Sequence, residues 1–137
     1  MVVDKENAQK KVRYYRSNGF TLQWFSRGNM PAHPTVFLKR ELYSRFGFFK
    51  TDYKISADFE LLTRFFIKGK ISYHYMPEVI VYMCRGGRSS NGFQATYVIN
   101  KEIVRACREN DVKTNIVKVY LKYFTKIFQL FTRMEKA

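Results

Sequence analysis

The chain has 137 residues, which is enough for one compact domain but not comfortably for two. Hydrophobic residues make up 46% of the sequence, which excludes wholesale disorder. The formal net charge of +14 indicates a polyanionic partner (nucleic acid, anionic lipid or a phosphorylated substrate) or else a solvated basic surface. No stretch of about 18 residues is free of charge, so no membrane-spanning helix is expected.

The first residues lack the apolar run of a signal peptide. Cys84 and Cys107 stand far apart without a CxxC partner, which favours unpaired thiols in a reducing compartment. His33 and His74 have no metal-ligand spacing with each other or with the cysteines. We therefore expect a cytoplasmic protein without a zinc site, and the inner face of the membrane is the alternative location.

Hydrophobic periodicity and turn residues predict alternating strands and helices. The predicted strands are Lys11–Arg16, Thr35–Leu38, Ile71–Tyr75 and Glu78–Cys84. The predicted helices are Phe20–Arg27, Arg40–Phe46, Ala57–Lys68, Phe93–Asn110 and Val112–Met134. Ser56 is the expected N-cap of the third helix, and Gly47 is the expected stop of the second.

The last predicted helix has an apolar side and a basic side. Ile116, Tyr120 and Tyr123 begin an apolar stripe, while Lys118 and Lys122 lie on the polar side. Such a helix either packs on the domain or lies in a membrane interface. We accordingly divide the chain into a domain over residues 1–110 and a basic amphipathic helix over residues 111–137.

Two carboxylates, Asp58 and Glu60, fall in the first turn of the predicted helix Ala57–Lys68. The helix dipole favours negative charge there, and simple helix-start electrostatics would explain both residues. Glu60 has Arg64 four residues further on, which predicts a structural ion pair. Asp58 has no such local cation, so its carboxylate is left to accept a proton from another group.

Two further segments are candidates for binding. In the loop Arg85–Ser89, the amides of Gly86 and Gly87 and the charges of Arg85 and Arg88 could bind a phosphate or pyrophosphate, although a turn alone would have the same composition. His33, between two prolines, could hydrogen-bond a sugar hydroxyl or a phosphate oxygen, or could simply be packed.

The chain contains no GxxxxGK[ST] or GxGxxG nucleotide cradle. It also contains no Asp-x-Asp, because its aspartates are Asp4, Asp52, Asp58 and Asp111.

Taken in order over residues 12–110, these segments resemble the C-terminal, acceptor-side portion of family-2 glycosyltransferases. The segments that carry the resemblance are His33-Pro34-Thr35, Arg40-Glu41-Leu42-Tyr43, Gly47-Phe48-Phe49, Ala57-Asp58-Phe59-Glu60-Leu61 with Arg64, and Gly86-Gly87-Arg88-Ser89. The resemblance implies part of a GT-A fold: an α/β architecture (α+β for an isolated fragment) with a small mixed sheet, flanking helices and a long C-terminal amphipathic helix.

The resemblance also implies an inverting transfer from a nucleotide-sugar donor to a glycan or lipid-linked acceptor. Asp58 falls at the position of the general base, and Arg85–Ser89 falls where a loop covers the donor pyrophosphate. His33 and Glu60 are assigned to the acceptor or sugar pocket.

The family holds a divalent metal, Mg or Mn, with an Asp-x-Asp in its N-terminal half, and this chain has no such motif. We therefore expect a divalent metal in a full-length enzyme, and no bound metal and no transferase activity for these residues alone.

Two alternatives without catalysis stay open. The charge and the interleaved aromatic residues would suit a nucleic-acid-binding module, but the chain has no recognition motif, so nucleic acid is the less favoured partner. The last helix would suit an adaptor at an anionic membrane surface.

Overall fold

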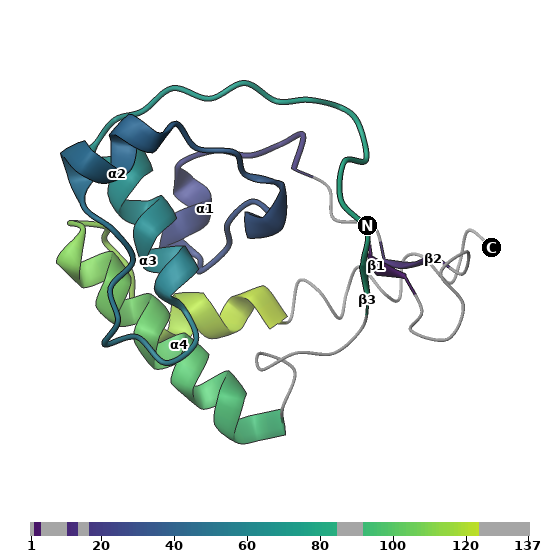
Figure 1. Ribbon diagram of the computed structural model, residues 1–137. Helices are drawn as coiled ribbons and strands as arrows, with labels where there is room; N and C mark the ends of the chain where they lie inside the picture. Colours follow the sequence, from purple (N-terminus) through teal and green to yellow (C-terminus); the bar gives the residue numbers. More distant parts are fainter. Residues whose placement is uncertain (1, 4–10, 14–16, 85–91, 124–137) are drawn as a thin grey trace.

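The computed structural model describes residues 2–3, 11–13, 17–84 and 92–123 (Figure 1). The described part is predominantly helical. Its helices are α1 (Gln23–Ser26), the 3-10 turn η1 (His33–Thr35), α2 (Arg40–Phe46), α3 (Ala57–Thr63), the π-helical turn η2 (Arg64–Lys68) and α4 (Gly92–Glu109). Residues 116–123 are also helical.

The strands are short. They are β1 (Val2–Val3), β2 (Lys11–Arg13) and β3 (Met83–Cys84). β1 pairs antiparallel with β2 and parallel with β3. This pairing involves only two or three residues a strand, and the buried core of the described residues is formed by the helices and the segments that join them. The expected α/β fold around a mixed sheet is therefore wrong, and the fold is helical.

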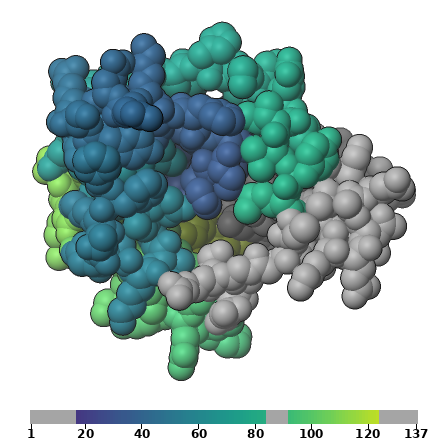
Figure 2. All heavy atoms as spheres, in the orientation of Figure 1, coloured from purple at the N-terminus to yellow at the C-terminus, as the bar shows by residue number. Residues whose placement is uncertain are grey.

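Three predicted strands, which fall in two segments of the chain, account for most of this error. Thr35 belongs to η1 and residues 36–38 continue as irregular chain, while residues 71–82 arch over the helices toward β3 without forming a strand (Figure 1). The second segment lies on the surface (Figure 2), where Tyr73 and Tyr82 are more than half exposed. Aromatic and β-branched residues favour strands only when a partner strand supplies hydrogen bonds and packing.

The helix predictions agree with the structure much better. The bounds of α2 are those predicted, α3 and η2 together span the predicted third helix, and α4 is shifted by one residue at each end. Gly47 ends α2 with a φ of 90°, in the left-handed region that favours glycine. These elements depend on contacts between near neighbours in the sequence.

The core lies where α3 and η2 pack against α1 and α4. Its buried members are mainly aromatic and aliphatic: Phe20, Phe25, Tyr53, Phe59, Leu62, Phe66, Ile103, Ala106, Cys107 and Val119. Phe25 contacts the rings of Phe20 and Phe59 edge-on, with centroids 5.7 Å apart in both pairs. This cluster fixes α3, which carries both carboxylates of interest.

The backbone that leads into α3 is held by a side chain from α4. Ser56 occupies the predicted N-cap position, but its hydroxyl is buried and makes no cap hydrogen bond. The Glu102 carboxylate instead accepts hydrogen bonds from the backbone N–H groups of Lys54, Ile55 and Ser56 at 2.6, 3.0 and 2.8 Å. A carboxylate here also suits the positive end of the helix dipole.

The helix at residues 116–123 departs from its predicted orientation. Lys122, assigned to the polar side, is buried, and its Nζ donates to the Gly28 carbonyl at 3.4 Å. Val119 is also fully buried, whereas Ile116 and Tyr120 of the apolar stripe are exposed. Among the described residues, no helix has the length and apolar character needed to cross a membrane.

Candidate functional site

Asp58 and His33, selected independently from the sequence, lie in direct contact. The His33 Nδ1 is 2.9 Å from Asp58 Oδ2. Asp58 projects from the first turn of α3, where its Oδ1 accepts the Phe59 N–H at 2.8 Å. Both side chains reach the surface, with 53% of His33 and 23% of Asp58 exposed. The pair is thus ordered and accessible to a ligand.

The backbone around His33 is stiff. Pro31 and Pro34 fix φ on either side, and η1 turns the chain at His33 itself. The Thr35 hydroxyl donates to the Ala32 carbonyl at 2.7 Å, which closes the same turn. The extended strand predicted to begin at Thr35 would not give this geometry. The turn presents the imidazole to α3.

The contact changes the acidity of the histidine. The hydrogen bond to Asp58 raises the pKa of His33 above its ordinary value of 6.5, against the opposing effect of partial burial, and the negative charge of Asp58 adds to the increase. A larger share of His33 is therefore protonated near neutral pH than for a free histidine.

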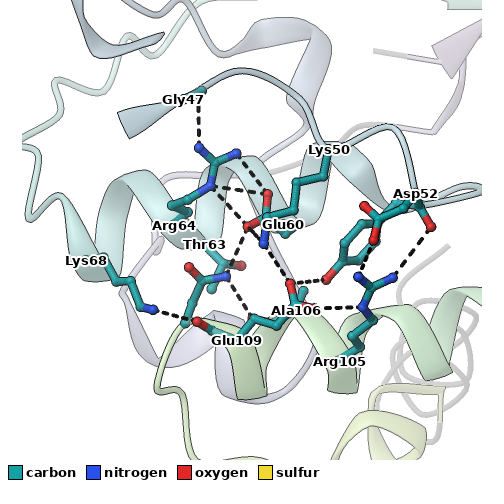
Figure 3. A network of polar contacts seen from close by, with 12 residues as sticks. Gly47, Lys50, Asp52, Glu60, Thr63, Arg64, Lys68, Arg105, Ala106 and Glu109 are labelled. Atoms are coloured by element: carbon teal, nitrogen blue, oxygen red, sulfur yellow. Dashed lines mark hydrogen bonds and ion pairs between the residues drawn. The ribbon is translucent and has the colours of Figure 1, made fainter. Parts of the chain in front are cut away.

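Glu60 has a very different environment, although it is two residues from Asp58. Its side chain has no exposed surface. The predicted ion pair with Arg64 is confirmed, with Nη2 and Oε2 3.0 Å apart. Lys50 Nζ lies 3.1 Å from Oε1, and the Asn110 amide donates to the same oxygen at 3.3 Å (Figure 3). The carboxylate assigned to the acceptor pocket therefore lies in the interior and has no open face for a sugar.

Burial by itself raises the pKa of Glu60, but hydrogen bonds from Arg64, Lys50 and Asn110 more than offset this and hold the pKa below its ordinary value. Arg64 also donates to the carbonyl groups of Phe46, Gly47 at 3.0 Å and Phe48 at 2.8 Å. Arg64, at the junction of α3 and η2, thus ties these helices to the end of α2 and the chain that follows it. The role of Glu60 is to hold this cation in place.

The network continues to the end of α4 (Figure 3). Glu109 Oε2 accepts hydrogen bonds from Lys50 at 2.7 Å and from the Tyr53 hydroxyl at 2.9 Å, and Arg105 Nε lies 2.7 Å from Oε1. Burial opposes ionisation of Glu109, but these donors lower its pKa to about 2. The group is therefore an ionised structural carboxylate near neutral pH, which is unsuited to take up a proton.

Sequence reasoning did not find Lys50, Glu102 or Glu109. Each acts on a residue more than forty positions away, as for the 59 positions between Lys50 and Glu109. No local spacing could indicate these distant pairs, whereas the contact of Glu109 with Arg105 joins residues four apart on α4. The contact between His33 and Asp58 was also absent from the sequence analysis, although both residues were selected.

The other predicted site residues cannot be placed. Arg85, Gly86, Gly87, Arg88 and Ser89 lie outside the described residues. Within the described ranges, no three His, Cys, Asp or Glu side chains come together as a metal site would require. A surface hollow is lined by residues 51–55 and Val98, and neither His33 nor Asp58 contributes to it.

Comparison with known proteins adds no relative, since no family model, curated protein or solved structure matches this chain. The resemblance to glycosyltransferases consequently rests on the ordered motifs alone.

Proposed function

We propose that this chain carries the acceptor side of an inverting glycosyltransferase and that Asp58 is its general base. In this reaction, Asp58 takes the proton of an acceptor hydroxyl while that oxygen attacks the anomeric carbon of a nucleotide-sugar. The bond from the anomeric carbon to the diphosphate breaks, and its electron pair leaves with the nucleoside diphosphate. Attack opposite the leaving group inverts the configuration.

The contrast between Asp58 and Glu60 carries the proposal. Both lie in the first turn of α3, but Glu60 is buried and satisfied by two cations, whereas Asp58 is ordered and reaches solvent. A general base must come within hydrogen-bonding distance of its substrate, and in this turn only Asp58 meets that condition. The ordered motifs around Asp58 supply the reaction class.

Stabilisation of the departing diphosphate is assigned to the segment Arg85–Ser89. Two guanidinium groups and the amides of a glycine pair suit a diphosphate chemically. The sequence has no Asp-x-Asp, and among the described residues no His, Cys, Asp or Glu side chains cluster as the ligands of a divalent metal. No step is therefore assigned to a metal here, and the Mg or Mn of the family belongs to the donor side.

Replacing Asp58 with Asn tests the proposal in the full-length gene product. We expect turnover to fall by roughly 10²–10⁴-fold, because general base catalysis typically contributes that much. Donor affinity should change little, since Asn retains the shape of the side chain. Transfer is followed as nucleoside diphosphate release from a panel of UDP-, GDP- and dTDP-sugars, with glycan and lipid-linked acceptors. Glu41→Gln, an exposed acid on α2, is the matched control. Turnover retained in Asp58→Asn would exclude this role.

A second candidate function, attachment to an anionic membrane surface, is favoured by the helix at residues 116–123. Its exposed side chains include Ile116, Val117, Tyr120 and Leu121, and Lys118 is exposed among them. An apolar face with neighbouring lysines suits the interface of a bilayer that contains anionic lipid. This attachment is compatible with transfer to a lipid-linked acceptor at the inner face of the membrane.

We expect the double variant Val117→Ser/Leu121→Ser to bind vesicles containing phosphatidylglycerol several-fold more weakly than the wild-type chain, because two apolar side chains no longer enter the interface. Cosedimentation measures the bound fraction, with phosphatidylcholine vesicles as the neutral reference. Phe93→Ser removes an apolar side chain that is 95% exposed on α4 and is the matched control. If the wild type, the double variant and Phe93→Ser bind the anionic vesicles equally, this helix has no role in membrane attachment.

A further inference from the structure

The geometry around Asp58 contains a second titratable group whose function is unassigned. His33 Nδ1 lies 2.9 Å from Asp58 Oδ2, and Phe59 N–H occupies Oδ1. His33 Nε2 has no hydrogen-bond partner among the described residues, and the imidazole is half exposed. The contact is thus a close approach of 2.9 Å between a surface histidine nitrogen and one oxygen of the proposed base.

We propose that His33 is a positioning residue for Asp58, and that protonation of His33 switches the base off. This inference rests on the function proposed for Asp58. A neutral imidazole with its proton on Nδ1 donates to Oδ2, which fixes the carboxylate orientation and leaves it basic. An imidazolium makes a charge-assisted hydrogen bond to the same oxygen, which stabilises the ionised carboxylate and lowers its ability to accept the proton of the acceptor hydroxyl.

The two elements in contact determine which charges matter. His33 lies on η1 and Asp58 lies on α3. Within the described part of the chain, Asp58 is the one charged or titratable group that shifts the pKa of His33. The two cations beside the first turn of α3 are directed elsewhere, since Lys50, from the chain between α2 and α3, and Arg64, at the start of η2, bind Glu60. The titration of His33 is therefore coupled mainly to Asp58.

The pH dependence of activity separates a switch from a merely structural contact. In the wild-type full-length enzyme, kcat/KM should decline as the pH falls through the raised pKa of His33, above about 6.5. His33→Asn places an amide N–H near the position of Nδ1 but does not titrate. This variant should keep most activity at pH 8, and the decline of its kcat/KM on the acid side should move to lower pH than in the wild type.

His33→Ala removes the donor altogether, so kcat should fall several-fold at every pH while the KM of the acceptor changes little. His74→Asn is the matched control because His74 is the other histidine of the chain and is exposed. If kcat/KM of His33→Asn declines at low pH over the same range as kcat/KM of the wild type, the inference is overturned. Complete loss of activity in His33→Asn at pH 8 would also overturn it, because His33 would then be the reacting base itself.

An NMR titration of the chain tests the contact without any turnover. The imidazole signals of His33 and His74 are followed from pH 5 to pH 9 in the wild type, in Asp58→Asn and in Glu41→Gln. The pKa of His33 should fall toward 6.5 in Asp58→Asn and stay raised in Glu41→Gln. An unchanged His33 titration in Asp58→Asn would refute the switch, whereas the role of Asp58 is decided separately by the turnover of Asp58→Asn.

Discussion

Replacing Glu60 with Gln should lower the free energy of unfolding by roughly 3 kcal/mol, because it leaves Arg64 and Lys50 beside a neutral buried side chain. Breaking a buried ion pair by removing one partner typically costs about 3–5 kcal/mol. We expect the lower end of this range. Arg64 keeps its backbone carbonyl acceptors, and Lys50, which is partly exposed, keeps Glu109. Urea unfolding of the full chain, followed by circular dichroism, measures the change.

Two comparisons make the Glu60 result specific. Glu41→Gln removes an exposed acid that lies 3.7 Å from Lys39, and exposed pairs contribute only about 0–1 kcal/mol. Lys50→Gln should lower the free energy of unfolding by less in the Glu60→Gln variant than in the wild type, because Glu60, the buried partner of Lys50, is already absent. If Glu60→Gln is no more destabilising than Glu41→Gln, the network does not hold α3 as described.

Replacing Phe25 with Ala should lower the free energy of unfolding by roughly 3–5 kcal/mol, which is the usual cost of truncating a buried aromatic residue. The Phe25 side chain is completely buried. Its ring lies between those of Phe20, Phe59 and Phe66, with centroid distances of 5.7, 5.7 and 5.9 Å. The truncation leaves a cavity where α1 meets α3 and η2. Thermal and urea unfolding of the full chain provide the measurement.

Phe25→Leu retains more of the buried volume, so it should lower the free energy of unfolding by less than Phe25→Ala does. Phe93→Ala is the surface control, because 95% of Phe93 is exposed, and its effect should stay within about 0.5 kcal/mol. If Phe25→Ala lowers the free energy of unfolding no more than Phe93→Ala does, the aromatic cluster is not the core.

The two carboxylates of α3 show how far local reasoning reaches. The ion pair of Glu60 with Arg64 was predicted because residues four apart lie on one face of a helix. The same argument separated Asp58 as the carboxylate without a local cation. It could not show that Glu60 is fully buried, because burial there depends on Lys50 and Asn110, which come from other parts of the chain.

Asp58 likewise has a partner that spacing could not indicate. Its contact with His33 depends on the turn η1, which ends at Thr35, the residue where the sequence pattern predicted a strand to begin. The chain that leads into α3 is a similar case. Ser56 is a typical N-cap residue, but the acceptor for the backbone amides is Glu102 of α4. A polar group binds whichever partner the folded chain brings nearest.

The sequence by itself determined the helices α2, α3 and α4, since helical hydrogen bonds join residues four apart and the stop at Gly47 is a local property. It also determined which of two neighbouring acids has an ion-pair partner on its own helix. Only the tertiary structure decided the fate of the predicted strands, because a strand exists only when a distant segment pairs with it. It also decided the burial of Lys122 and the contact of His33 with Asp58, since both depend on how separate elements pack together.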